Sequence, residues 1–129
     1  MSFLNNIFGN SPSKNNETAI TWIPLNSLGQ LSEIKIASIS NPIIIFKHSS
    51  RCSISRMALK QFEKEYNLEP NISCYYLDLL NFRPIADAIS TQFNLVHQSP
   101  QLLLIKSGVC TFSASHESIS VEDLKLKIV

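Results

Sequence analysis

The segment Phe46-Lys47-His48-Ser49-Ser50-Arg51-Cys52-Ser53-Ile54-Ser55 is the part of the sequence that decides the fold. It begins at the end of a short continuous apolar run, 42–46, which is typical of a strand buried on both faces. Apolar residues recur at helical spacing from about Cys52 to Asn67. We therefore predict a central strand, then a polar loop that carries Lys47 and His48, then a helix that begins at or just before Cys52.

Cys52 lies where the start of a helix favours a thiolate. The first turn leaves backbone N–H groups unpaired at the positive end of the helix dipole, and cysteines at such positions are often reactive. No Asp or Glu occurs between Glu33 and Glu63, whereas five basic residues do: Lys35, Lys47, Arg51, Arg56 and Lys60. The sequence therefore predicts an exposed, reactive thiol in a positive field. The alternative is a buried structural cysteine on a solvated basic face.

Strands and helices alternate on both sides of this segment. We predict further strands at 20–23, 72–77, 101–106 and 109–113, and further helices at 27–39, 83–93 and from 120 onward. In the helix after Cys52, the predicted core stripe is Ile54, Met57, Ala58, Phe62 and Tyr66. The order βα, then βαβαββα, predicts an α/β fold with a mixed sheet covered on both faces. Its last seven elements resemble the thioredoxin fold, preceded by an extra strand and helix.

Composition narrows the class of protein. A chain of 129 residues with 44% hydrophobic and 16% charged residues fits one globular domain, predicted at 19–129, after a flexible N-terminal tail at 1–18. A net charge of +1 gives no pull toward nucleic acid or membrane, and no apolar run is long enough to span a bilayer. Without an apparent secretory signal, a reducing cytoplasm is the expected location.

The small numbers of glycines and cysteines exclude several kinds of site. Three glycines cannot supply a phosphate-binding loop, and three cysteines without a C-x-x-C pair suggest neither a disulfide framework nor a zinc site. We expect no bound cofactor. Cys74 and Cys110 lie within predicted strands, where small buried hydrophobic side chains are expected.

Two further features describe the chemistry at Cys52. Ser55 stands where a dithiol oxidoreductase has its resolving cysteine; a serine can hydrogen-bond the thiolate but cannot attack a mixed disulfide. Ser99-Pro100 immediately precedes a predicted strand, and in a thioredoxin-like domain this place holds a cis-proline that faces the active cysteine. The alternative is an ordinary proline at a strand entry.

The stretch from Ile45 to Ser55 resembles the active-site signature of the YtxJ family, the monothiol bacilliredoxins, which is typically Thr-Cys-Pro-Ile-Ser after a Lys-His-Ser stretch. The resemblance extends to 21–25, to 99–105 and to the Ala-Ser-His at 114–116. It implies a thioredoxin-like fold and removal of bacillithiol from S-bacillithiolated proteins through Cys52. Arg51 and Ser53 depart from the motif, standing where the family usually has Thr and Pro.

The resemblance also implies partners: S-thiolated client proteins, and bacillithiol or another low-molecular-weight thiol as co-substrate. Bacillithiol carries a malate, so Arg51 and Lys47 are candidate carboxylate contacts. His48 either shifts the thiolate equilibrium or positions a carboxylate, or else has only a loop role. A second hypothesis, from another class, is a non-catalytic binding module that holds a partner along the Pro100 edge.

Overall fold

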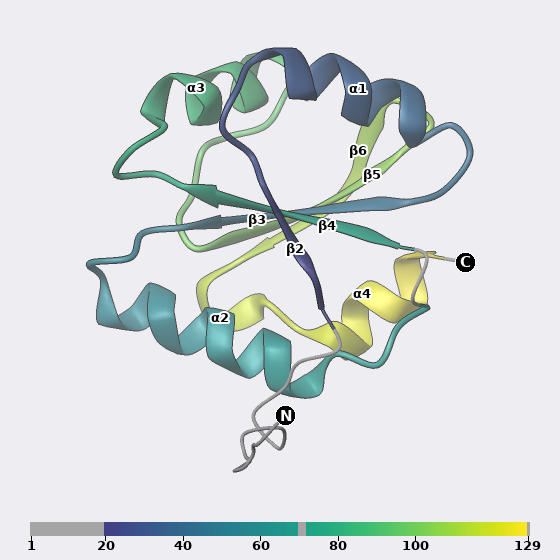
Figure 1. Cartoon of the computed structure of the whole chain (residues 1–129). Helices are drawn as coiled ribbons and strands as arrows, with labels where there is room; N and C mark the ends of the chain where they lie inside the picture. The colour runs from purple at the N-terminus through teal and green to yellow at the C-terminus, as the bar shows by residue number, and fades with distance from the viewer. Residues whose placement is uncertain (1–19, 70–71, 129) are drawn as a thin grey trace, which may run out of the picture.

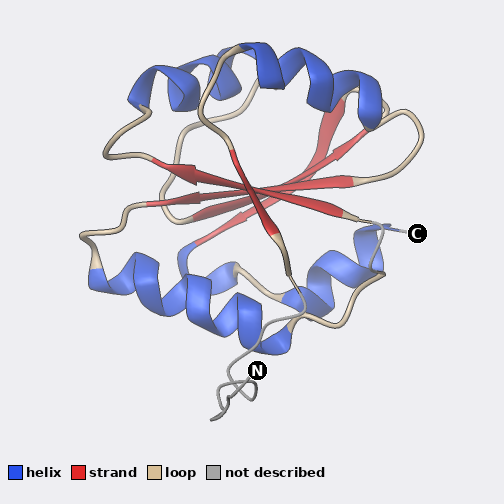
Figure 2. Cartoon of the chain, viewed as in Figure 1, coloured by secondary structure: helices blue, strands red, loops and turns tan. Residues whose placement is uncertain are grey.

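A five-stranded sheet separates two layers of helices, with α1 and α3 on one face and α2 and α4 on the other (Figures 1 and 2). The computed structural model describes residues 20–69 and 72–128, so the tail predicted at 1–18 lies outside the described residues. The elements follow in the order β2 (Trp22–Pro24), α1 (Gly29–Ala37), β3 (Ile43–His48), α2 (Ser53–Glu65), β4 (Ser73–Asp78), α3 (Arg83–Gln92), β5 (Gln101–Lys106), β6 (Val109–Ser115), the short 3-10 helix η2 (His116–Ser118) and α4 (Val121–Ile128).

The strands stand in the order β2-β4-β3-β5-β6. The first three run parallel, whereas β5 pairs antiparallel with β3, and β6 pairs antiparallel with β5. This arrangement confirms the predicted α/β order, including the extra strand and helix before β3. It also brings the C-terminal end of β3 beside the N-terminal end of β5, where Lys47 pairs with Gln101.

The central strand is longer than predicted. Lys47 and His48 are the last two residues of β3, not part of a polar loop, and both are buried. Because both residues are polar, the apolar run in the sequence ends before them. Pairing extends the strand through them, because His48 lies opposite Asp78 on β4 and Lys47 lies opposite Gln101 on β5.

Each face of β3 contributes to a separate hydrophobic core. Successive side chains of a strand point to opposite faces. Ile44 and Phe46 therefore pack with Phe62 and Leu124 from the α2 and α4 layer. Ile43 and Ile45 pack in the α1 and α3 layer, with Leu31, Ile34, Ile85 and Ile89. A strand buried in this way needs helices on both sides, which explains the three layers.

The predicted core stripe of α2 is only partly right. Phe62 and Tyr66 are buried, but Ile54 and Met57 are 62% and 71% exposed. The buried face of α2 instead begins at Ser55, which is fully buried. Because the first buried residue of this face is polar, the apolar pattern of the sequence predicts its neighbours Ile54 and Met57 as core residues instead.

The β5–β6 turn is fixed to the end of α1. Ser107 and Gly108 have φ values of 53° and 81°, the left-handed backbone that a two-residue hairpin turn requires. The N–H groups of Ser107 and Gly108 donate to the backbone and hydroxyl oxygens of Ser38, at 2.9 and 2.8 Å. In the described parts of the chain, no helix has the length and apolar character needed to cross a membrane.

Two substitutions in α2 test the observed direction of its buried face. Phe62→Ala should lower the free energy of unfolding by about 3–5 kcal/mol, because it leaves a cavity against Phe46 and Tyr66. Met57→Ala, at an exposed position, should change it by less than about 0.5 kcal/mol. Urea denaturation followed by circular dichroism measures both. A loss at Met57 as large as the loss at Phe62 would contradict the observed face.

Candidate active site

Cys52 is the N-cap residue of α2, and its side chain is exposed. Its backbone is extended, with φ −97° and ψ 122°, and its carbonyl accepts the first helical hydrogen bond from the N–H of Arg56 at 3.0 Å. Its own N–H donates to the carbonyl of Ser49 at 3.1 Å, which closes the loop between β3 and α2 into a turn. Cys52 therefore directly precedes the first turn of α2, with its unpaired N–H groups, as the sequence predicts.

Ser55 and His48 lie together beneath this turn. The Ser55 hydroxyl oxygen accepts the N–H of Ser49 at 2.9 Å and lies 2.8 Å from Nδ1 of His48. Both side chains are buried. The sequence suggested that Ser55 could hydrogen-bond the thiolate, but among the described residues its bonds run to Ser49 and His48. Ser55 thus holds the β3–α2 turn in shape, and His48 is a buried strand residue bonded to Ser55 and not a loop residue.

Two acidic side chains near His48 were not expected from the sequence. Burial lowers the pKa of His48, while the carboxylates of Asp78 and Glu63 act in the opposite direction. Asp78 is the strand partner of His48, and Glu63 accepts a 2.6 Å hydrogen bond from the indole N–H of Trp22. The hydrogen bond between Nδ1 of His48 and the Ser55 hydroxyl can run in either direction, according to the tautomer of the imidazole. Although no Asp or Glu occurs between Glu33 and Glu63 in the sequence, the fold brings the carboxylates of Asp78 and Glu63 near His48.

Ser99 and Pro100 lie at the same edge of the sheet as Cys52. The peptide bond between them is cis, at the place where the thioredoxin fold predicted it. Pro100 directly precedes β5, whose first residue pairs with Lys47 near the end of β3, and its carbonyl accepts the N–H of His116 at 3.1 Å. In the loop that leads to Pro100, Nδ1 of His97 and Oγ of Ser99 are buried without a hydrogen-bond partner among the described residues.

The two predicted carboxylate contacts lie in different environments. Arg51 is exposed in the turn beside Cys52. Lys47 is fully buried, and its ammonium donates to the Gln101 side-chain oxygen at 2.7 Å. Burial lowers the pKa of Lys47 to about 8. The structure therefore brings Arg51, but not Lys47, to the surface where a ligand of Cys52 would lie.

The other two cysteines are less accessible. Cys74 in β4 is buried, and burial raises its pKa to about 11. Cys110 in β6 is partly buried, and its pKa is also raised by burial. The structure thus agrees with the prediction of packing roles for both. Over the described residues, no three His, Cys, Asp or Glu side chains are placed to hold a metal ion.

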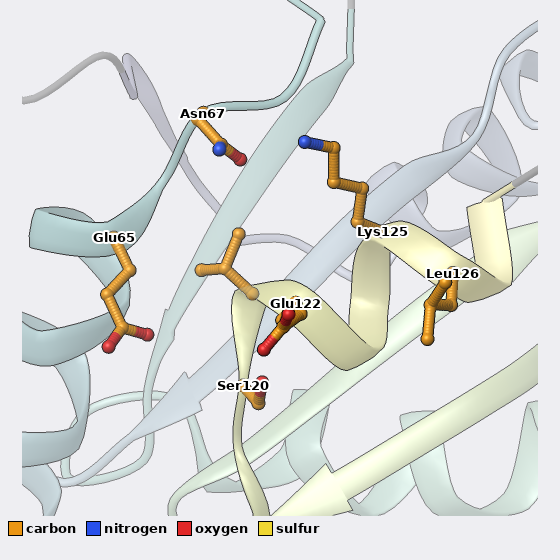
Figure 3. Close-up of a pocket in the computed structure, with 7 residues that line it drawn as sticks. Glu65, Asn67, Ser120, Glu122, Lys125 and Leu126 are labelled. Atoms are coloured by element: carbon orange, nitrogen blue, oxygen red, sulfur yellow. The ribbon is translucent and has the colours of Figure 1, made fainter.

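Two surface hollows adjoin α2. One, of about 450 Å³, lies between the C-terminal end of α2 and the start of α4, away from Cys52 (Figure 3). The other, of about 520 Å³, lies along the N-terminal half of α2 near Cys52. It is lined by Ile54, Met57, Ala58, Gln61, His116, Glu117 and Ile119. The exposed Ile54 and Met57 thus form an apolar wall of this hollow, which begins two residues after Cys52.

A family model described as monothiol bacilliredoxin BrxC matches residues 23–124, a range that contains every candidate site residue. The chain belongs to the monothiol bacilliredoxin family. A solved structure named as a candidate oxidoreductase with a thioredoxin fold is 30% identical and superposes with a TM-score of 0.71, over 81% of this chain and 91% of that one.

The similarity of this chain to thioredoxins is low in sequence and shows a common fold alone. Fasciola hepatica thioredoxin is 17% identical, with a TM-score of 0.64, over 81% of this chain and 94% of its own. The short form of spinach chloroplast thioredoxin f is 13% identical, with a TM-score of 0.64, over 87% and 95%. Family and fold together make this bacilliredoxin a thiol-disulfide oxidoreductase. They favour the enzyme over the non-catalytic binding module.

The three cysteines should differ strongly in reactivity. At pH 7, iodoacetamide should modify Cys52 at least about tenfold faster than Cys74 or Cys110, because Cys52 is exposed while burial keeps the other two protonated. Peptide mapping by mass spectrometry over time measures the three rates. The protein unfolded in guanidinium chloride is the control, and there the three rates should converge. Preferential labelling of Cys74 in the folded protein would exclude this assignment.

Proposed function

We propose that this bacilliredoxin removes a low-molecular-weight thiol, bacillithiol or a similar molecule, from mixed disulfides on client proteins through Cys52. The observation that carries the proposal is an exposed thiol at the start of α2 with a serine, not a cysteine, one turn later. Such a site can accept a thiol but cannot release it by forming an internal disulfide.

The reaction consists of two thiol-disulfide exchanges. The Cys52 thiolate attacks the sulfur of the small thiol, the bond between that sulfur and the client sulfur breaks, and the client leaves as a thiolate that takes up a proton. Cys52 now carries the small thiol as a mixed disulfide. A second small-thiol thiolate attacks the small-thiol sulfur, which yields the symmetric small-thiol disulfide and restores the Cys52 thiolate. No net electrons are gained or lost by the enzyme over the cycle.

Polar groups in the loop before Pro100, together with Arg51 in the turn before Cys52, support a polar small thiol as the ligand. The unpartnered Ser99 hydroxyl and His97 Nδ1 lie in the loop that ends at Pro100, and each can bond to a hydroxyl or amide. The exposed guanidinium of Arg51 suits the malate carboxylates of bacillithiol. Lys47 has no part in this contact, because it is buried.

The apolar hollow beside Cys52 supports a protein as the other half of the mixed disulfide. Ile54 and Met57 expose apolar surface in the first turns of the helix that Cys52 caps, and such surface is typical of interaction sites. The client polypeptide flanking the modified cysteine would lie there. Three unpaired cysteines accord with a reducing cytoplasm as the place of action.

Transfer of bacillithiol tests the proposal directly. Incubated with a protein bacillithiolated at one cysteine, the wild type should release that protein and carry a bacillithiol adduct on Cys52, detected by intact-mass spectrometry. Cys52→Ser should do neither, because a hydroxyl is not ionised near neutral pH. Cys74→Ser and Cys110→Ser are the matched controls, and both should transfer at close to the wild-type rate. Clearance of the adduct without added thiol, lost in Cys110→Ser, would instead identify Cys110 as a resolving cysteine.

Replacing Ser55 tests the monothiol character of the site. Ser55→Cys creates the C-x-x-C spacing, so an internal disulfide between positions 52 and 55 should form on oxidation, and activity toward ordinary protein disulfides should appear. Loss of two protons in the intact mass, with the bond located by non-reducing peptide mapping, measures it. Ser53→Cys is a control whose new thiol adjoins Cys52 at the wrong spacing. If oxidised Ser55→Cys keeps two free thiols, then residues 52 and 55 do not share a turn as described.

A further inference from the structure

Lys47 is a buried lysine between the sheet and the α1 and α3 layer. It lies near the end of β3 with no exposed surface. Its side chain faces the α1 and α3 layer, where Asp87 favours its charged form, Arg83 disfavours it, and Cys110 of β6 also acts on it. Removing an ammonium from water is costly, and exchanging such a buried charge for a well-packed apolar chain is often neutral or stabilising. The fold alone therefore gives no reason for a lysine here.

The polar contacts of Lys47 lead to the Pro100 loop. Its Nζ donates to Oε1 of Gln101 at 2.7 Å. The same oxygen accepts the N–H of Gln98 at 3.3 Å, and Nε2 of Gln101 donates to the carbonyl of Val96 at 3.1 Å. Gln101 is itself buried. Its side-chain amide therefore bonds two backbone groups of the loop on one side and the Lys47 ammonium of β3 on the other.

The position of this pair links it to the active-site edge. Lys47 and Gln101 are direct partners in the antiparallel β3–β5 pair. One residue after Lys47 is His48, which contacts Ser55; one residue before Gln101 is Pro100. A shift of Gln101 would therefore move Ser99 and Pro100 relative to Cys52, and small displacements of positioning groups can slow a reaction strongly.

We propose that Lys47 and Gln101 form a buried clip that fixes the loop 96–100 at the active-site edge, so that Ser99 and Pro100 are placed against the small-thiol half of a mixed disulfide. This inference rests on the proposed function. Lys47 is a positioning residue: it acts through Gln101 and does not touch the reacting sulfurs.

Apolar variants of matched length separate positioning from folding. Lys47→Met removes the anchor, and Lys47→Met/Gln101→Met removes the whole clip without leaving a buried charge unpaired. Lys106→Met, at the opposite end of β5, is the control; Lys106 contacts the carbonyl of Ile128, far from the loop. Four measurements apply to each variant: the denaturant midpoint, the iodoacetamide rate at Cys52, the hydrogen exchange of the Gln98 amide, and the rate of transfer from a bacillithiolated peptide.

The double variant should stay folded, with a denaturant midpoint at or modestly below that of the wild type, because the Gln98 N–H and the Val96 carbonyl lose the Gln101 amide. It should react with iodoacetamide within about twofold of the wild-type rate. Its Gln98 amide should exchange at least about tenfold faster, and its transfer rate should fall about tenfold. Lys47→Met should change in the same direction, and Lys106→Met should match the wild type. Unchanged Gln98 exchange, or faster exchange with undiminished transfer, would overturn the proposal. So would an equal fall in the iodoacetamide rate, because Lys47 would then act on the thiol itself.

A glutathionylated peptide, assayed in parallel, separates this inference from the proposed function. A wild type that acts on the glutathione mixed disulfide but not on the bacillithiol one contradicts the choice of thiol, while the clip is still judged by the variants on the glutathione substrate. A wild type that acts on neither, with a labelled and accessible Cys52, contradicts the proposed function and with it the positioning role of the clip.

Discussion

Burial of β3 on both faces is the constraint on which the rest of the molecule depends. All six of its side chains are buried, so helices must cover both sides, and strands must pair along both edges. The same constraint builds the active site. Where β3 ends, its neighbour β5 begins, and the polypeptide turns sharply into α2. Cys52 follows the end of β3, the cis-proline precedes the start of β5, and the buried His48–Ser55 pair joins β3 to α2. These groups therefore lie at the same end of the sheet.

The sequence predicts the fold well where the hydrophobic pattern is periodic and less well where polar side chains are buried. The order of strands and helices follows from apolar runs and turn residues, and the structure confirms it. The sequence pattern ends β3 at Phe46, two residues too early, because Lys47 and His48 are polar and resemble loop residues. The face of α2 was misjudged because its first buried residue is Ser55. In each case a partner from elsewhere in the chain makes a polar side chain acceptable in the interior, and no local pattern reports that partner.

Partners from distant parts of the chain also decide which parts of the site can be predicted from the sequence. Cys52 and the serine at 55 can be found from helix geometry and spacing, and Pro100 from its place before a strand. Asp78 and Glu63 near His48, and Gln101 bonded to Lys47, come from other elements and become neighbours only through strand pairing and packing. Family membership gives the chemistry of the thiol. The structure adds the surroundings of that thiol, where Arg51 and Ser53 flank Cys52 at the start of α2.

The pairing of β3 with β5 also bears on how the protein is made. Lys47 and Gln101 are separated by 54 residues, so the two sides of the site are synthesised at different times. A growing chain that has emerged only as far as α3 already carries the thiol of Cys52, but not the strand beside it or the loop that borders it. Contacts so distant in sequence require a large loop-closure entropy, which slows their formation. During synthesis, therefore, the sulfur of Cys52 emerges before β5 and the loop that precedes it, and under the proposed function the C-terminal third of the protein completes the surface that would select a substrate.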